Sequence, residues 1–291
     1  MENLQSHSFN GVKLHWLDKG QGSVVFFVPG SNGDYRAWTN QVDEFSKHFR
    51  TIIVSRRFQF PDKYPKGGSS SIDDNCNDLF QLFGHLNISK ATVIGHSFGG
   101  YVSLAFAEKH PNLIEKLVLE EPTVFTFITS NPNNPLKLLP LMLKDFSAAT
   151  SFMRTGLKGI KPTKKYLALG QLEKAKLSFA DGIIGHRVNL NDLNPIMRQG
   201  LEDNIATFAG ESKTAFSYPL SEERLKNVTA KTLLLESDKS PKWFGYICQQ
   251  LKMLLPNSEL KKISSPTHWL HLDNADEFNK TVINFIKSEN E

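Results

Sequence analysis

The stretch IGHSFGG, Ile94–Gly100, decides how the rest of the chain is interpreted. Ser97 stands in it between two glycines, in the pattern G-x-S-x-G, after a short apolar run and before an amphipathic stretch. A serine at a sharp strand-to-helix turn needs small neighbours, because the backbone there closes tightly. The start of the following helix directs N–H groups toward any negative charge that develops beside the serine. The stretch therefore predicts a reactive serine, and a glycine-rich turn with a capping serine is the simpler alternative.

Short apolar runs recur on both sides of this turn and are separated by helical patterns. The runs are Val24–Val28, Thr51–Val54, Ala91–Gly95, Lys116–Glu120, Lys231–Glu236 and Glu259–Ile263. The helical patterns are Ile72–Leu86, Gly99–Lys109, Trp243–Leu254 and Ala275–Lys287. Continuous apolar strands that alternate with helices predict an α/β fold, a mostly parallel twisted sheet with helices on both faces.

The segment 123–227 interrupts this alternation. It lacks convincing strands, is rich in phenylalanine, and carries helical patterns at Leu136–Met153, Thr163–Phe179 and Asn194–Phe208. We therefore expect a core formed by residues 1–122 and 228–291, with a helical cap inserted at 123–227. Most of the aromatic side chains should pack between the cap and the sheet, and a few should line a pocket, because ligand sites favour such junctions.

With this order of strands, serine turn and helices, the chain resembles the α/β-hydrolase superfamily over nearly its whole length. The resemblance implies that Ser97 is the nucleophile and that the N–H group of Phe98 forms one half of an oxyanion hole. The other half comes, in that family, from the loop after an early strand, which is usually marked by His-Gly. Here that loop begins Pro29-Gly30, so the resemblance implies Ser31 as the donor, with Asn32 as the second choice.

A late stretch, SSPTHWLHLDNADEF at residues 264–278, resembles the G-H-x-x-H-x-E-x-P-x-x-F segment of the same family. The resemblance implies that His268 is the general base and that His271 is a structural second histidine. The chemistry agrees, because a serine hydroxyl needs a nearby imidazole to take its proton. Taken alone, either histidine would be more simply explained as a surface or packed core residue.

The acid that orients the histidine is left open by the sequence. The family pattern of strand, Gly-x-x-Asp and Pro aligns with LLLESDKSP, Leu233–Pro241, and puts Ser240 where the aspartate is expected. Asp238 lies two residues earlier and is equally explained as a turn cap. Some relatives carry the acid after the strand that follows the nucleophile helix, and here that strand ends in Glu120 and Glu121. Successive side chains of a strand face opposite ways, so only one of the two faces the histidine. The expected order is Glu121, then Glu120, then Asp238.

Two consecutive arginines, Arg56 and Arg57, follow the second apolar run. They suit either the binding of a carboxylate substrate or ion pairs with nearby acids such as Asp34. Ion pairs that brace the loop are the favoured interpretation.

Composition and charge argue against several other classes of protein. The net charge of the 291-residue chain is only +4, and its apolar runs fall short of the roughly 18 residues that a membrane span needs. One dense group of lysines is more typical of a solvated helix face than of a surface that binds nucleic acid or a membrane. Its members are Lys158, Lys161, Lys164, Lys165, Lys174 and Lys176. The two cysteines have no metal-site spacing and the N-terminal residues do not form a secretory pattern, so a cytoplasmic protein is expected.

These features and the resemblance predict a serine hydrolase for a small, largely apolar carboxylic ester or lactone, without a metal or organic cofactor. Hydrolysis of a C–C bond by the same residues is a related alternative. A non-catalytic small-molecule receptor or scaffold is the other class. A serine at position 240, where the family's acid is expected, favours this class, whereas the presence of both Ser97 and His268 argues against it. A serine rather than an aspartate at the turn argues against haloalkane dehalogenase and epoxide hydrolase chemistry.

Overall fold

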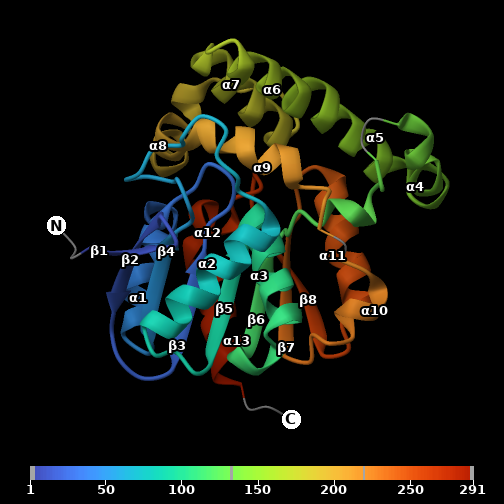
Figure 1. Cartoon of the computed structure of the whole chain (residues 1–291). Coiled ribbons are helices and arrows are strands. Elements are labelled where there is room, and N and C mark those ends of the chain that lie inside the picture. Colours follow the sequence, from blue (N-terminus) through green and yellow to red (C-terminus); the bar gives the residue numbers. More distant parts are fainter. Residues whose placement is uncertain (1–3, 132–133, 219, 289–291) are drawn as a thin grey trace.

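The computed structural model describes residues 4–131, 134–218 and 220–288, and in them eight strands form a single sheet (Figure 1). The strand order is β1-β2-β4-β3-β5-β6-β7-β8, and every pair from β4 to β8 is parallel. The strands are β1 (Gln5–Phe9), β2 (Val12–Lys19), β3 (Val24–Val28), β4 (Arg50–Ser55), β5 (Ala91–His96), β6 (Ile114–Glu120), β7 (Lys231–Ser237) and β8 (Ser258–Ile263). The mostly parallel sheet that the sequence predicted is confirmed.

Helices cover both faces of the sheet. One face packs against α1 (Thr39–Ser46), α12 (Leu270–Asp273) and α13 (Ala275–Lys287), and the other against α2 (Ile72–His85), α3 (Ser97–Lys109) and α11 (Lys242–Leu254). Strand β3 shows the alternation: Val25 and Phe27 belong to the first layer of the core, and Phe26 and Val28 to the second. Burial on both faces is the reason that the central strands have continuous apolar sequences.

The sequence analysis did not predict the N-terminal hairpin of β1 and β2. Asn10 and Gly11 connect these strands and have positive φ angles of 50° and 81°. Two consecutive residues with positive φ form the turn whose twist suits a two-residue hairpin, and Asn-Gly is the pair that most favours it. β2 then pairs antiparallel with β4, which adds an antiparallel edge to the sheet.

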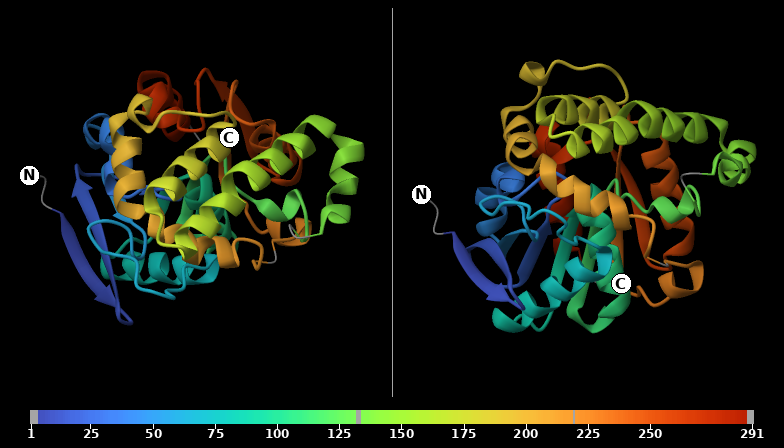
Figure 2. Two further views of the ribbon diagram at one scale, coloured as in Figure 1. Left: turned by 90° about the horizontal axis from the view of Figure 1, so that it is seen from above. Right: turned by 45° about the horizontal axis from the view of Figure 1, so that its top comes forward.

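Between β6 and β7 the described residues contain helices but no strand. We call residues 123–227 the helical segment; Figures 1 and 2 show most of it lying across one end of the sheet. Its helices are α4 (Leu139–Lys144), α5 (Phe146–Arg154), η5 (Thr155–Ile160), α6 (Lys161–Ala168), α7 (Leu172–Ile184), α8 (Pro195–Asn204), α9 (Phe208–Thr214) and α10 (Glu222–Leu225), with short 3₁₀ turns between some of them. α5, η5 and α6 follow one another without a break and form one long helical run.

Two of the expected helices are divided in the structure. The pattern 136–153 is interrupted at Asp145, whose carboxylate accepts a hydrogen bond of 2.8 Å from the N–H of Ala148 and so begins a new helix. The pattern 163–179 is interrupted at Gly170, which has a φ of 68°. A capping aspartate and a glycine with positive φ are ordinary helix boundaries, and the apolar periodicity continues through both of them.

A pair of glycines sets the packing inside the helical segment. A Cβ atom added to Gly159 of η5 would lie 2.5 Å from the Cα atom of Gly182 in α7. The two helices therefore cross at a point where neither has a side chain. The same region is joined to the core by Trp243, whose indole N–H donates a 3.1 Å hydrogen bond to Thr155.

Candidate active site

Ser97 is the first residue of α3, directly after β5, and its φ of 54° lies in the left-handed region. The residues two positions before and after it, Gly95 and Gly99, have no room for a side chain. A Cβ atom on Gly95 would lie 2.4 Å from the Ser103 hydroxyl, and one on Gly99 would lie 2.3 Å from the carbonyl oxygen of Pro29. The turn thus holds a serine in a costly backbone conformation, a feature that is concentrated at functional sites.

His268 and Glu121 form a hydrogen-bonded pair, and His268 lines a cavity that Ser97 also lines. Nδ1 of His268 lies 2.7 Å from Oε2 of Glu121, and both side chains are buried. Nε2 of His268 has no hydrogen-bond partner among the described residues. Ser97 and His268 line the same cavity. The structure therefore brings together Ser97, His268 and Glu121, with one imidazole nitrogen bound to a carboxylate and the other free.

Ser240, which occupies the expected place of the acid, contacts Glu121 instead. Its hydroxyl donates a hydrogen bond to Oε1 of Glu121, and the N–H group of Ser237 donates to the same oxygen at 2.9 Å. Together with Nδ1 of His268, three donors converge on one carboxylate. The turn after β7 thus holds a carboxylate that comes from the end of β6.

The other two candidate acids lie elsewhere. Glu120 faces away from His268, as the alternation of side chains along a strand requires; both of its oxygens lie 2.8 Å from Nδ1 of His271. Asp238 accepts a hydrogen bond of 3.0 Å from the N–H of Ser265 and is partly exposed. Neither carboxylate contacts His268 in the structure.

Of the three residues proposed for an oxyanion hole, Ser31 and Phe98 line the cavity beside Ser97. The N–H group of Ser31 donates no hydrogen bond within the described part of the chain. Asn32 does not line this cavity; its φ is 59°, and its side chain is buried where neither of its polar atoms has a partner among the described residues. The structure thus brings Ser31 and Phe98, but not Asn32, to Ser97.

The cavity has a volume of about 700 Å³ and lies between the sheet and the helical segment. Aromatic side chains from both parts form much of its wall: Phe98, Phe125, Phe152, Phe179, Phe208, Phe216, Trp243 and Trp269. Five of these come from the phenylalanine-rich segment, at the junction where the sequence predicted a pocket. Phe146 of that segment is instead 64% exposed.

The sequence model of the alpha/beta hydrolase fold family matches residues 23–275 of the chain. The chain belongs to the alpha/beta hydrolase fold family. This membership confirms the family that the sequence resembles and the expectation that the protein is a hydrolase. The matched range includes the serine turn, Glu121, which follows β6 directly, and His268.

Named relatives of this hydrolase have different activities. It is 26% identical to sn-1-specific diacylglycerol lipase ABHD11 of Danio rerio over 274 residues, which cover 92% of the chain and 80% of that protein. It is 29% identical to Epoxide hydrolase 1 of Caenorhabditis elegans over 110 residues, which cover 37% of the chain and only 27% of that protein. Among solved structures, a thermophilic esterase from Thermogutta terrifontis with malate bound has a TM-score of 0.72 and 19% identity, covering 98% of this chain and 97% of that one. At that identity the likeness shows a shared fold.

Burial controls the protonation of the His268 ring in the hydrolase. Burial lowers the pKa of His268 well below 6.5, and the nearby rings of His96 and His271 lower it further. Burial also raises the pKa of Glu121 above 4.5, while the hydrogen bonds from Ser240 and Ser237 oppose that rise. A neutral imidazole is the form that can accept a proton from a serine.

A second buried pair supports the loop that carries His268. The N–H of His271 donates a hydrogen bond of 3.2 Å to Glu120, and Nε2 of His96 lies 3.0 Å from the carbonyl oxygen of His268. Ligand atoms of His96, Glu120 and His271 lie within 4.8 Å of one another, close enough for a metal ion. Hydrogen bonds between Glu120 and His271 already engage both carboxylate oxygens and Nδ1, so the group has a structural explanation.

The ion pairs of the two arginines differ from the expected ones. Asp34 pairs with Arg36 at 2.7 Å rather than with either arginine. Arg57 pairs with Asp78 at 2.7 Å, which braces the loop as expected. Arg56 pairs at 2.6 Å with Glu211, a residue that the sequence analysis did not single out.

Glu211 joins the helical segment to the loop of the proposed oxyanion donor. It belongs to α9, and its side chain lines the cavity although only 1% of the residue is exposed. One of its oxygens binds Arg56, and the other accepts a hydrogen bond of 2.5 Å from the Ser31 hydroxyl. Arg56 in turn donates to the carbonyl oxygens of Pro29 and Gly30, both at 2.9 Å. No local pattern in the sequence marks Glu211, because its partners lie about 155 and 180 residues away.

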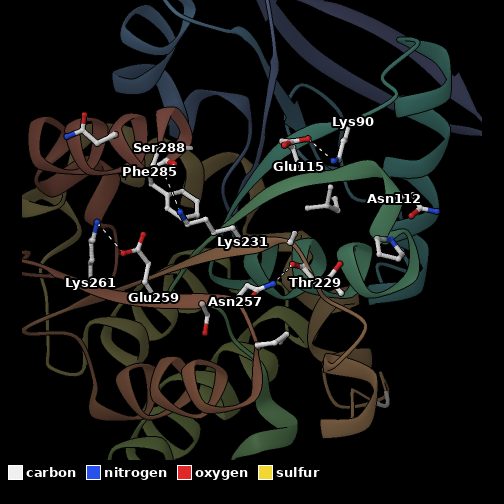
Figure 3. A pocket seen from close by; sticks show the side chains of 16 residues that line it. Lys90, Asn112, Glu115, Thr229, Lys231, Asn257, Glu259, Lys261, Phe285 and Ser288 are labelled. Atoms are coloured by element: carbon white, nitrogen blue, oxygen red, sulfur yellow. Dashed lines mark hydrogen bonds and ion pairs between the residues drawn. The ribbon is translucent and has the colours of Figure 1, made fainter. Parts of the chain in front are cut away.

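A larger cavity, of about 960 Å³, lies at the opposite end of the sheet, where β6, β7 and β8 begin. Figure 3 shows its polar lining, with ion pairs between Lys90 and Glu115 at 2.8 Å and between Lys261 and Glu259 at 3.5 Å. Neither Ser97 nor His268 reaches it. Chemistry rather than volume therefore identifies the smaller cavity as the candidate active site.

In the described residues no helix is both long enough and apolar enough to cross a bilayer.

Proposed function

We propose that this hydrolase cleaves a small carboxylic ester or lactone through an acyl-enzyme, with Ser97, His268 and Glu121 as a catalytic triad. The observation that carries the proposal is the pairing of His268 with Glu121 through Nδ1, which leaves Nε2 unpartnered on the cavity of Ser97. A nucleophile, a base and a carboxylate that orients the base are the three parts that acyl transfer needs. The aromatic lining of the cavity supports a largely apolar substrate.

In the first half of the reaction, Oγ of Ser97 attacks the acyl carbon and its proton passes to Nε2 of His268. The resulting imidazolium is stabilised by the carboxylate of Glu121. When the tetrahedral intermediate collapses, the C–O bond to the leaving alcohol breaks and the alkoxide takes the proton from Nε2. The acyl group is then held as an ester of Ser97 and His268 is again neutral.

In the second half, water takes the place of the alcohol. His268 removes a proton from the water, whose oxygen forms a bond to the acyl carbon. The bond to Oγ of Ser97 then breaks and the serine recovers the proton. The products are a carboxylic acid and an alcohol, and a lactone gives one hydroxy acid.

The negative charge on the intermediate needs fixed donors. We assign this role to the N–H groups of Phe98 and Ser31, with the N-terminus of α3 adding a favourable dipole. The free N–H group of Ser31 and its place on the cavity wall support this assignment. Asn32 is the weaker candidate because it lies outside the cavity.

We also propose that residues 123–227 act as a cap on a core of residues 1–122 and 228–291. The cavity wall draws on both parts, so the cap would enclose the substrate and exclude water from it. Core and cap are joined at Glu211 and at Trp243.

Two measurements test the function. Reaction with a fluorophosphonate should modify Ser97 in the wild-type chain and leave Ser97→Ala unmodified. Wild type should hydrolyse p-nitrophenyl butyrate at least about a thousandfold faster than Ser97→Ala, because removal of a triad nucleophile has effects of this size or larger. Equal rates for the two folded proteins across several acyl lengths would exclude this esterase function and favour a receptor or a C–C bond hydrolase.

The epoxide hydrolase relative suggests epoxide hydrolysis as a competing reaction. The identity of the nucleophile, Ser97, distinguishes it from ester hydrolysis. An aspartate that opens an epoxide forms an ester with the substrate carbon, and water can hydrolyse that ester; a serine hydroxyl would form an ether instead, which water does not cleave. We therefore expect no turnover of styrene oxide under conditions in which p-nitrophenyl butyrate is hydrolysed.

A further inference from the structure

The lysines that the sequence concentrates between residues 158 and 176 have different surroundings in the structure. Lys176 is buried and forms ion pairs with two glutamates. Lys161 and Lys164 instead line the cavity that contains Ser97, where Lys213 of α9 joins them. We call Lys161, Lys164 and Lys213 the lysine trio.

One face of the run α5–η5–α6 forms a wall of this cavity. Many of its lining residues lie three or four positions apart, as expected for one side of a helix. In chain order they are Phe152, Met153, Thr155, Gly156, Leu157, Ile160, Lys161 and Lys164. Apart from one threonine the wall is apolar up to Ile160, and it becomes basic at Lys161. Leu157, on the apolar part, is 57% exposed, so this wall offers a solvent-accessible apolar surface beside the lysines.

The charge of the lysine trio is not compensated within the cavity. All three side chains are exposed, and none forms an ion pair or hydrogen bond with another residue in the part of the chain that the structure describes. Glu211 is the one carboxylate among the described lining residues, and Arg56 neutralises it at 2.6 Å. The rings of His96 and His268 are neutral because burial lowers their pKa values. A cavity wall with net positive charge attracts an anionic ligand.

We propose that the substrate bears an anionic group, a carboxylate or a phosphate, which an apolar portion separates from the ester. This inference rests on the proposed ester hydrolysis and adds the substrate class. With the ester carbonyl at Ser97, the apolar portion packs against the aromatic wall and the anion meets the lysine trio. The proposal explains why one helix face carries both an apolar surface and uncompensated lysines.

The test compares two series of p-nitrophenyl esters. One consists of mono-p-nitrophenyl esters of linear dicarboxylic acids of increasing length, and the other of the same compounds with the free carboxylate methylated. At the best chain length, kcat/KM should be on the order of tenfold higher for the anionic ester, since each exposed Lys–anion contact contributes up to about fivefold. The preference should shrink as the salt concentration rises, because salt screens exposed charges.

Variants assign the preference to the lysine trio. In Lys161→Gln/Lys164→Gln/Lys213→Gln the ratio of the two kcat/KM values should fall toward one. Lys165→Gln is the matched control, because Lys165 lies on the same helix, is exposed and does not line the cavity. It should keep the wild-type ratio. Thermal unfolding of both proteins verifies that they are folded.

The outcomes separate this inference from the proposed function. Hydrolysis of the neutral esters with no preference for the anionic series at any length would overturn the inference and leave the esterase function intact. A preference that survives the triple change would also overturn it. Failure of both series would overturn the esterase function itself. A third series that ends in phosphate identifies the anion, and a preference for either anion that depends on the lysine trio supports the proposal.

Discussion

The carboxylate of Glu121 is held by side-chain and backbone groups from two separate loops. His268 binds one of its oxygens, and Ser240 and the Ser237 N–H bind the other. The φ of Glu121 is 41°, so the backbone itself is bent to bring this side chain to the histidine. A residue in such a conformation persists only when its surroundings fix it.

The first prediction concerns the identity of the acid. Glu121→Gln should lower kcat for p-nitrophenyl butyrate by about 10³- to 10⁴-fold, because an amide does not stabilise the imidazolium and can favour the wrong tautomer. Asp238→Asn should stay within about twofold of wild type, since Asp238 binds only the loop at Ser264 and Ser265 and is partly exposed. Steady-state kinetics on folded variants checks both. If Asp238→Asn lost most of its activity and Glu121→Gln remained active, Asp238 rather than Glu121 would be the acid of the triad.

The second prediction concerns Ser240. Ser240→Ala removes one neutral donor from Glu121 and should lower kcat by roughly fivefold, which corresponds to about 1 kcal/mol. Ser240→Asp alone places two carboxylates side by side and should reduce activity at neutral pH. Combined with Glu121→Gln, the new aspartate restores a single acid at the position usual in the family.

Kinetics of the double variant Glu121→Gln/Ser240→Asp provides the decisive comparison. It should be at least about tenfold more active than Glu121→Gln, since one charged partner of the histidine is recovered. A double variant no better than the single one would show that the turn after β7 cannot supply an acid here.

The third prediction is a pH profile. Burial holds the pKa of His268 well below 6.5, so the ring stays neutral as the pH falls to that value and becomes protonated only below it. The kcat/KM of a non-ionising ester should therefore be constant between about pH 8 and pH 6.5 and decrease at lower pH, because the acidic limb reports the base of the free enzyme. An acidic limb centred at or above pH 6.5 would contradict the burial argument.

At the scale of elements, the crossing of η5 and α7 depends on glycine. Gly159→Ala would place a Cβ atom 2.5 Å from the Cα of Gly182, and the two helices would have to move apart. We expect a loss of about 1–3 kcal/mol in the free energy of unfolding, as is typical of overpacking. Denaturation in urea measures it.

Gly156→Ala is the matched control for this change. It lies in the same helical run, and a Cβ atom there would meet nothing within 4 Å. Alanine should stabilise that position by roughly 0.5–1 kcal/mol through its higher helix propensity. Equal effects of the two substitutions would refute the importance of the glycine contact.

Elements of the core could be predicted wherever burial gives a simple pattern. The last helix, Ala275–Lys287, has the predicted bounds, and the central strands differ from prediction by no more than two residues at an end. β1 and β2 do not form continuous apolar runs, because β1 is mostly exposed and β2 is exposed at its ends, so apolar runs alone do not predict them. In the helical segment the apolar period continues through Asp145 and Gly170, so the breaks at these residues were not predicted.

The same contrast holds for the candidate site. Family motifs led to Ser97 and His268. The alternation of side chains showed that only one of Glu120 and Glu121 could face the histidine, and the resemblance to relatives with the acid just before the turn favoured Glu121. The sequence could not show that Asn32 lies outside the cavity of Ser97, because the direction of a side chain in a loop follows no regular period. Glu211 was missed for a similar reason, since a contact between residues 155 positions apart leaves no local pattern.

At the scale of the whole molecule, the buried pair of Arg56 and Glu211 links the two parts of the chain. Glu211→Gln would leave the guanidinium of Arg56, which is only 3% exposed, without this carboxylate. We expect a loss of about 3 kcal/mol in the free energy of unfolding, as is usual when one partner of a buried pair is removed. Glu222→Gln, at an exposed position of the same segment, is the control and should have little effect. A Glu211→Gln protein as stable as this control would show that the pair does not join the two parts.

The contact between Glu211 and Ser31 ties α9 of the helical segment to a loop that lines the cavity of Ser97. α9 thereby holds the loop whose N–H group is proposed to stabilise the negative charge of the intermediate. Binding of a substrate beneath α9 and its hydrolysis would therefore depend on the same contact. A substrate that fits beneath α9 leaves this contact in place and meets a complete site. An ester on a polymer or a protein surface would push α9 aside and loosen the donor at the moment it is needed. Esters of larger molecules would then be hydrolysed more slowly than small ones, and the contact between α9 and the Ser31 loop would select substrates by size.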